Sequence, residues 1–148
     1  MSSDANYWHH QHREFNRQAD VLANHAAQGA SHLEWHETFA HAKYLWVQMD
    51  GSMHPHGSGS SAILWASRRL PSEVWVESEW TLVASISLHI VAESVVQTEL
   101  VAAVLAYALV EDYISNDFSL SVEGLMGLEA MTIANRVMAK SGTRSSAG

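Results

Sequence analysis

The chain has 148 residues, of which 47% are hydrophobic, and its sixteen acidic side chains outnumber eight basic ones to give a formal charge of −8 with histidine neutral. This length fits one domain, and a hydrophobic fraction of this size excludes disorder along the whole chain. The absence of cysteine excludes a disulfide scaffold, a cysteine nucleophile and thiolate metal sites.

Residues 4–28 have the spacing of an amphipathic helix, because large apolar side chains recur every seven residues. These side chains are Trp8, Phe15 and Leu22. Gly29 ends this helix, and Ser31 can cap a second one that continues to about residue 50. A connection this short favours antiparallel packing of two helices. We therefore predict an N-terminal α-hairpin over residues 4–50.

Residues 51–61 are dominated by Gly and Ser and predict a flexible loop. Beyond this loop the period of the hydrophobic pattern changes. Between Val74 and Ile90, eight of the nine even positions are apolar, against two of the eight odd positions. That alternation is typical of strands, so we predict short antiparallel strands within residues 61–91. The alternative is one long helix that begins at Pro71, a position where proline is well tolerated.

Helical spacing returns toward the C-terminus. Residues 99–115 are apolar nearly all round, which predicts a buried central helix. Ser121 can cap a last helix that continues to about Lys140. The apolar stripe of this last helix consists of Val122, Leu125, Met126, Ala130, Ile133, Val137 and Met138. We expect residues 141–148 to be a disordered tail.

These elements predict an α+β, helix-rich fold in a single domain over residues 1–140, with the α+β core in residues 62–140. An all-α helical bundle is the alternative if residues 73–91 are helical. The polar N-terminus lacks the apolar segment of a signal peptide, and the longest uncharged apolar run, residues 100–110, is too short to span a bilayer. We therefore expect a soluble, cytoplasmic protein without a transmembrane segment.

Histidine spacing suggests one metal site. His32 and His36 are four residues apart, as are His89 and Glu93. Side chains at that spacing share a face of a helix, and three imidazoles with one carboxylate can bind zinc or iron. The strand prediction conflicts with this hypothesis, because His89 and Glu93 do not line up on a strand. The competing interpretation places both N-terminal histidines at the polar edge of a helix, without a metal.

Two further motifs bear on chemistry. Ser58 lies between two glycines, but its spacing differs from the Gly-x-Ser-x-Gly turn that presents a nucleophile, so we assign no catalytic residue. Glu111 and Asp112 follow the most apolar segment of the chain. Acidic side chains at the C-terminal end of a helix are unfavourable to the helix dipole. The pair therefore predicts an acidic surface that meets a cation or a basic partner.

Tryptophan is unusually abundant, with six residues in the chain. Trp35, Trp46 and Trp80 fit the predicted apolar stripes. The remaining three, Trp8, Trp65 and Trp75, are harder to bury together. Exposed tryptophan is typical of interface hot spots, so we predict these three as interface anchors.

Charge is distributed unevenly along the chain. Residues 70–135 contain ten acids and neither Lys nor Arg, whereas nine of the ten histidines lie in residues 1–56. The acidic half would repel a phosphate backbone, so we expect no nucleic-acid partner. Histidine titrates near pH 6.5, which suggests that mild acid strengthens contacts between the two halves, within or between subunits.

Three functions remain open on these observations. We expect a non-enzymatic interaction or assembly protein that forms a homo-oligomer or binds a basic protein partner. The first alternative is a helical protein or enzyme whose histidines bind zinc or iron. The second alternative binds a small molecule in a pocket lined by tryptophan.

Overall fold

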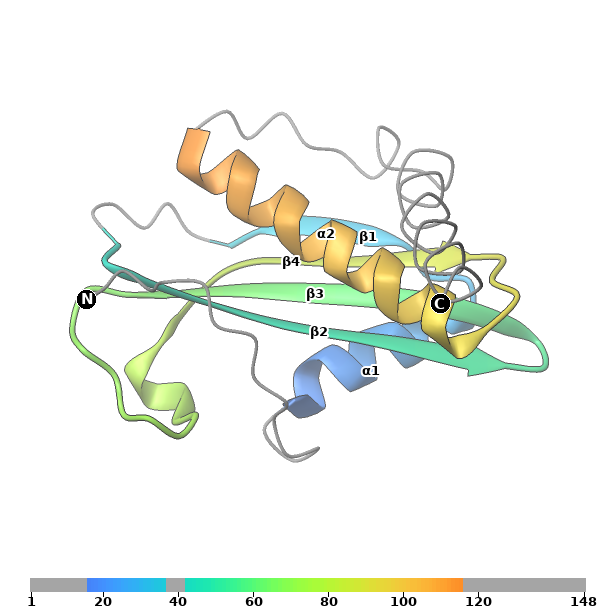
Figure 1. The fold of residues 1–148 in the computed structure, drawn as a ribbon, viewed down its shortest axis with the longest axis horizontal. Helices are drawn as coiled ribbons and strands as arrows, with labels where there is room; N and C mark the ends of the chain where they lie inside the picture. The colour runs from blue at the N-terminus through green and yellow to red at the C-terminus, as the bar shows by residue number, and fades with distance from the viewer. Residues whose placement is uncertain (1–15, 37–41, 116–148) are drawn as a thin grey trace, which may run out of the picture.

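The computed structural model describes residues 16–36 and 42–115, which form one four-stranded sheet with a helix on each side (Figure 1). In chain order the elements are α1 (Arg17–Ala27), β1 (His32–Trp35), β2 (Tyr44–His54), β3 (Gly57–Ser67), the 3₁₀ helix η2 (Glu77–Glu79), β4 (Thr81–Ile90) and α2 (Val95–Ser115). The strands lie in the order β1-β4-β3-β2, and every neighbouring pair is antiparallel.

Strands β2 and β3 form a long hairpin. Their pairing runs without a break from Tyr44 opposite Ser67 to His54 opposite Gly57, which leaves a turn of two residues between them. The adjoining pair, β3 and β4, contains one irregularity, between Leu64 and Trp65. The hairpin therefore provides the long side of the sheet, while β1 adds only four residues at the other edge.

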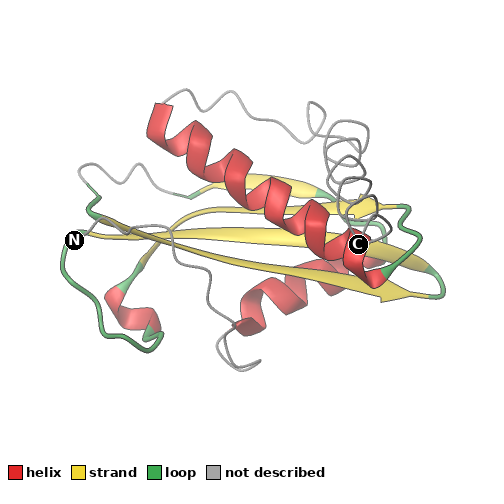
Figure 2. Ribbon diagram, viewed as in Figure 1, coloured by secondary structure: helices red, strands yellow, loops and turns green. Residues whose placement is uncertain are grey.

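Helices α1 and α2 cover opposite faces of the sheet, with α2 in front and α1 behind in the view of Figure 2. We call these the α1 face and the α2 face. Side chains alternate along a strand, so neighbours in β3 point to different helices. Leu64 lies in the cluster that contains α2, whereas Ile63 and Trp65 lie in the cluster that contains α1.

The α2 face is an aliphatic core. Its largest fully buried side chains are Leu64, Ile86, Leu88, Leu105 and Leu109. Helix α2 contributes one apolar side chain every three or four residues to this core, as an amphipathic helix does. Burying each such side chain stabilises the fold by about 2 kcal/mol before the cost of ordering it.

The α1 face is built from small residues and hydroxyl groups. Helix α1 buries only alanines against the sheet, namely Ala19, Ala23, Ala26 and Ala27. A Cβ atom on Gly57 or Gly59 would collide with the backbone of α1, so glycine at these positions lets the helix approach β3 closely. Gly29, with a φ of 105°, then adopts the left-handed conformation that ends α1.

The predicted N-terminal α-hairpin is wrong. Helix α1 is present, but the region from residue 31 to residue 50 contains β1 and most of β2 instead of a second helix. The apolar residues of this region fit a helical stripe, but the run Tyr44–His54 is also rich in residues that favour strands, and eleven successive partners in β3 are available. Tertiary pairing therefore overrides the local helical pattern.

The loop predicted over residues 51–61 is also wrong, because these residues form the end of β2, the tight turn and the start of β3. The alternation in residues 74–90 corresponds to a strand only from Thr81 onward. Helix and strand content are about equal, so the helix-rich description and the all-α alternative are both incorrect.

Several predictions fall outside the described residues. They concern the start of the first helix, Trp8, the last helix over residues 121–140 and the tail over residues 141–148. In the parts of the chain that the structure does describe, neither helix combines the length and the apolarity that crossing a bilayer requires.

Candidate functional site

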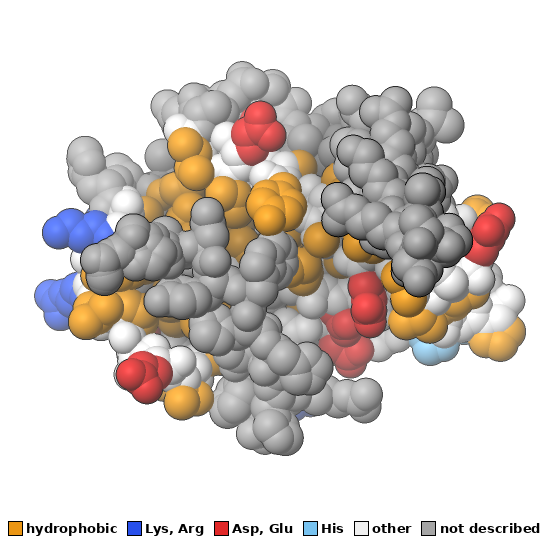
Figure 3. Space-filling view, in the orientation of Figure 1, with side chains coloured by type: hydrophobic (Ala, Val, Ile, Leu, Met, Phe, Trp, Pro, Cys, Tyr) orange, Lys and Arg blue, Asp and Glu red, His pale blue; other side chains and the backbone are white. Residues whose placement is uncertain are grey.

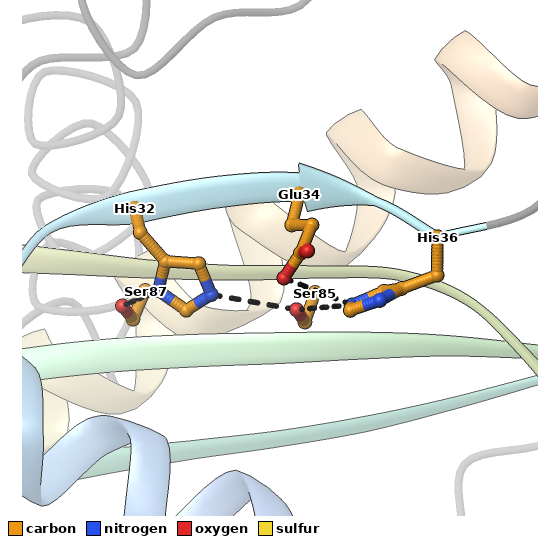
Figure 4. Close-up of polar contacts among 5 residues, drawn as sticks. All are labelled: His32, Glu34, His36, Ser85 and Ser87. Atoms are coloured by element: carbon orange, nitrogen blue, oxygen red, sulfur yellow. Dashed lines mark hydrogen bonds and ion pairs between the residues drawn. The ribbon is translucent and has the colours of Figure 1, made fainter.

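A row of histidine and serine side chains lies at the short edge of the sheet, on its α1 face (Figure 4). Strand β1 pairs with β4 so that His32 is opposite Ser87 and Glu34 is opposite Ser85. His36 follows β1 directly, and its backbone N–H donates to the carbonyl of Val83 at 2.8 Å. Alternation along both strands brings these polar side chains to one face.

The polar side chains of this row form a continuous chain of contacts. The Nδ1 atom of His32 lies 2.8 Å from the hydroxyl oxygen of Ser87, and its Nε2 atom lies 3.4 Å from that of Ser85. The same Ser85 oxygen lies 3.1 Å from Nε2 of His36, which is 3.5 Å from a carboxylate oxygen of Glu34.

One direction of hydrogen bonding satisfies these contacts with His32 neutral. The Ser87 hydroxyl donates to the carbonyl of Ala30 at 3.4 Å, so its oxygen accepts from the Nδ1–H group of His32. The Nε2 atom of His32 then accepts from Ser85, whose oxygen in turn accepts from His36. If both nitrogens of His32 carried a proton, its Nε2 atom would have to donate to Ser85 instead of accepting from it. This network of hydrogen bonds therefore favours the neutral imidazole of His32.

Burial adds to this preference, since desolvation lowers the pKa of His32 below its usual value. The negative charge of Glu34 raises the pKa in opposition, while His36 and His25 lower it further.

The row does not have the geometry of a nucleophilic triad. A triad needs the carboxylate on one imidazole nitrogen and the serine on the other. Here Glu34 and Ser85 both face Nε2 of His36. Both serines are also buried in the sheet, with 6% of Ser85 and 1% of Ser87 exposed. The row therefore joins an edge strand to its neighbour and leaves no accessible hydroxyl beside a base.

The four predicted metal ligands do not come together. His32 and His36 both contact the Ser85 hydroxyl, although residues four apart along extended backbone have Cα atoms about 13 Å apart, and Glu34 is the only carboxylate beside them in this row. His89 turns to α1, where its Nδ1 atom donates to the carbonyl of Ala26 at 2.8 Å. Glu93 lies before α2, and its backbone N–H donates to Gln97. Among the described residues, no three His, Asp or Glu side chains are placed to hold a metal ion, which corrects the prediction.

The two residues of the predicted acidic pair point to different sides of α2. Glu111 is exposed on the outside of α2, whereas Asp112 is turned toward the sheet and buried. A second carboxylate pair, which the sequence did not suggest, lies at the β2 edge. The pKa of Asp50 is raised to about 6, mainly by burial and then by a hydrogen bond with the Asp20 carboxyl group on α1.

Four tryptophans form one cluster on the α1 face. Trp75 is central, with ring centroids 5.0 Å from Trp65, 5.4 Å from Trp46 and 5.6 Å from Trp80. The Nε1–H group of Trp65 donates to Gln48 at 3.0 Å. Trp65 and Trp75 are 6% and 7% exposed, so within this chain both predicted anchors pack against other rings.

A hollow of about 510 Å³ lies where β3 ends, beside η2. Arg68, Arg69 and Glu79 are among the side chains that line it, and its lining contains no tryptophan. The tryptophan cluster and this hollow are thus different parts of the molecule.

The most unusual surface is the outer side of α2. Six apolar residues recur there at alternating spacings of four and three, and we call this set the outer stripe. The outer stripe consists of Val96, Leu100, Ala103, Tyr107, Val110 and Ile114. Successive helical residues turn by about 100°, so these six lie away from the most buried side of α2, and Leu100 and Val110 at its edges also pack against the core. Figure 3 shows hydrophobic side chains along the line of α2.

The outer stripe remains substantially open to solvent. The exposed fractions are 56% for Val96, 61% for Tyr107 and 71% for Ile114, and the other three members are partly buried. Glu99 and Glu111, both exposed, lie on opposite margins of the stripe. The sequence pattern contains this feature, but an all-round apolar segment predicts complete burial, which the exposed stripe corrects.

Comparison with protein-family models, with curated proteins and with solved structures finds no match to the chain.

Proposed function

We propose that this is a non-enzymatic interaction protein that binds an amphipathic helix with basic margins along the outer stripe of α2. The observation that carries the proposal is the outer stripe itself. Alternating spacings of four and three are those of a coiled-coil seam, in which each apolar side chain packs between residues of a facing helix.

The contrast between the two sides of α2 supports a docked partner. The inner side already fills the core with side chains such as Leu105 and Leu109, so the fold does not require a second apolar side. Tyr107 and Ile114 nevertheless remain more than half exposed. A large apolar stripe on a surface helix is typical of a docking site.

The charges beside the stripe indicate the chemistry of the partner. Glu99 and Glu111 border it on opposite sides, and α2 contains no basic residue. A helix with Lys or Arg beside its apolar residues would complement these carboxylates, whereas a second copy of α2 would bring acid against acid. The basic protein partner expected from the sequence is therefore preferred here to self-association through α2.

A designed peptide tests this proposal on the full-length chain. The probe is a helix as long as α2, with Leu at the seam positions and Lys beside them, and binding is measured by calorimetric titration. We expect saturable binding that Tyr107→Glu weakens about tenfold or more, because aromatic residues at the centre of an interface dominate its energy. A peptide of the same composition with its seam positions scrambled should bind far more weakly.

The matched control is Val91→Glu, which adds the same charge at a site 86% exposed and outside the stripe. It should leave the affinity unchanged. Equal affinities for both peptides, or equal losses in both variants, would contradict the proposal. Sedimentation velocity tests whether a second copy of the chain occupies the stripe. A dimer that Tyr107→Glu dissociates would identify the second copy as the partner and contradict the proposal.

A further inference from the structure

We propose that the attachment of β1 to the sheet is sensitive to mild acid, because it depends on His32 remaining neutral. When this imidazole gains a proton, β1 opens more often and the edge of β4 is uncovered. The inference does not depend on the proposed function, since β1 lies at the edge of the sheet and the outer stripe lies on α2.

Few contacts hold β1 in place. It has four residues, none of them fully buried, and among the described strands it pairs only with β4. Leu33 and Trp35 pack, partly buried, against the α2 face, whereas on the α1 face β1 is held by the polar row that begins at His32. Opening such an edge locally costs far less than unfolding the whole domain, so a small change at His32 is detectable there.

The hydrogen bonds around Ser85 do not accommodate a second proton on His32. A carboxylate oxygen of Glu34 lies 3.5 Å from Nε2 of His36, so this nitrogen carries a hydrogen and donates toward Ser85 as well. Within the described part of the chain, Nε2 of His32 is then the one acceptor left for the Ser85 hydroxyl. A proton on that nitrogen would leave the hydroxyl hydrogen of a buried serine without an acceptor, which is unfavourable.

The charged and titratable groups around His32 oppose a positive charge on balance. Glu34 is the one carboxylate among the described groups that act on it, and its side chain is 60% exposed, so water screens its attraction. The nearby histidines are His36 after β1, His25 on α1 and His89 on the same face of β4. Burial lowers the pKa of His32, His36 and His25 add to this, and Glu34 offsets it only in part.

The sign of the pH dependence follows from this lowered pKa. The folded edge binds the His32 proton less tightly than the opened edge, in which the imidazole is in water and has its ordinary pKa of 6.5. The contribution of His32 to the attachment is complete above that value and is lost as pH falls through it toward the lower pKa of the folded chain. Mild acid therefore opens β1, and β4 then presents unpaired backbone groups of the kind that accept another strand.

Amide hydrogen exchange on the full-length protein, followed by NMR at pH 7.5 and pH 5.5, tests the inference. Protection factors, which correct for the intrinsic effect of pH on exchange, are compared between the β1–β4 pairing and the β2–β3 hairpin. The backbone N–H of His36, bonded to the carbonyl of Val83 at 2.8 Å, reports directly on the attachment. We expect protection of the β1–β4 amides to fall about threefold or more at the lower pH, while protection in the hairpin does not fall.

Two glutamine variants identify the imidazole responsible. Glutamine keeps a donor and an acceptor but does not titrate, so His32→Gln should show the same protection of β1 at both pH values. The control His56→Gln removes an exposed histidine from the turn between β2 and β3 and should keep the wild-type pH dependence. A fall in protection that persists in His32→Gln or disappears in His56→Gln would overturn the inference, as would equal protection of wild-type β1 at both pH values.

Titration of the His32 imidazole in the wild type is a second test, which no substitution can disturb. It decides the matter if His32→Gln leaves β1 unprotected at both pH values. The ring protons of His32, followed by NMR, should titrate with a midpoint below the ordinary pKa of 6.5. A midpoint at or above that value would mean that the attached edge tolerates the charge, and the inference would fail.

Discussion

The two faces of the sheet are packed by opposite means. On the α2 face, large aliphatic side chains such as Leu64 and Leu105 fill the space between sheet and helix. On the α1 face, Gly59 and the alanines of α1 remove side chains so that the backbones approach each other. The difference shows that one sheet can hold two helices by different kinds of packing, and each face is sensitive to a different kind of substitution.

The contrast extends to polar groups. Two adjacent serines in the centre of the sheet each donate to the backbone of a different helix. Ser60 donates to the carbonyl of Thr98 in α2 at 2.6 Å, and Ser61 donates to that of Ala19 in α1 at 2.5 Å. Both helices are therefore held by a buried hydroxyl as well as by packing, and the two contributions can be separated by mutation.

Removing side-chain volume should destabilise the α2 face most strongly. Leu64→Ala leaves a cavity in a fully buried position, and we expect it to lower the free energy of unfolding by about 3 kcal/mol. Ile114→Ala removes a similar volume from the exposed side of α2 and should change the free energy of unfolding by less than about 0.5 kcal/mol. Urea denaturation measures both, and similar losses would show that the outer stripe is as well packed as the core.

Adding side-chain volume should destabilise the α1 face. Gly59→Ala places a methyl group against the backbone of α1, which cannot move aside as a flexible side chain can. We expect a loss of about 2 kcal/mol in the free energy of unfolding. Ser58→Ala, at the neighbouring buried position on the α2 face, should cost less than about 1 kcal/mol. A neutral Gly59→Ala variant would mean that α1 does not sit as close to β3 as described.

The two serines should report on one helix each. Ser60→Ala and Ser61→Ala each remove one buried hydrogen bond, and we expect each to cost about 1 kcal/mol. Hydrogen exchange then distinguishes them, because Ser61→Ala should accelerate amide exchange mainly in α1 and Ser60→Ala mainly in α2. Identical exchange patterns in the two variants would argue against separate attachment of the helices.

The smallest effect concerns the acidic pair at the β2 edge. A pKa of about 6 for Asp50 means that the folded chain binds this proton more tightly than the unfolded chain does. Its contribution to stability is therefore present at low pH and is lost as pH rises from about 4 to about 6.

Asp50→Asn removes that dependence and keeps an oxygen to accept the Gly51 N–H group. We expect the variant to be more stable than the wild type at pH 7.5 by up to about 1 kcal/mol, after allowing for solvent screening at a partly exposed site. Chemical denaturation between pH 4 and pH 7.5 measures the difference. A variant that is less stable throughout this range would show that the carboxylate is favourable as a charge.

The sequence predicted elements best where local pattern and tertiary pairing agree. The apolar segment over residues 99–115 does form a helix, and the alternation before residue 90 does mark a strand, because both patterns match their burial in the fold. Residues 44–50 satisfied a helical stripe and a strand equally, and only the partner strand decided between them. The local period of a hydrophobic pattern does not reveal long-range strand pairing of this kind.

The candidate site shows the same limit. Trp75 falls on the polar side of an alternating pattern, yet it is buried, because its segment precedes β4 and folds back onto the tryptophan cluster. The outer stripe could have been found from the alternating spacings of Val96 to Ile114. What the sequence did not provide was the direction in which α2 faces the sheet, and that direction decides which apolar side stays exposed.

The most direct test of the outer stripe is calorimetric titration of the basic amphipathic peptide into the full-length protein and its Tyr107→Glu variant. The account predicts saturable binding that this one substitution weakens about tenfold, while Val91→Glu leaves it unchanged. Equal affinity for the wild type and Tyr107→Glu would contradict the claim that α2 carries the docking surface.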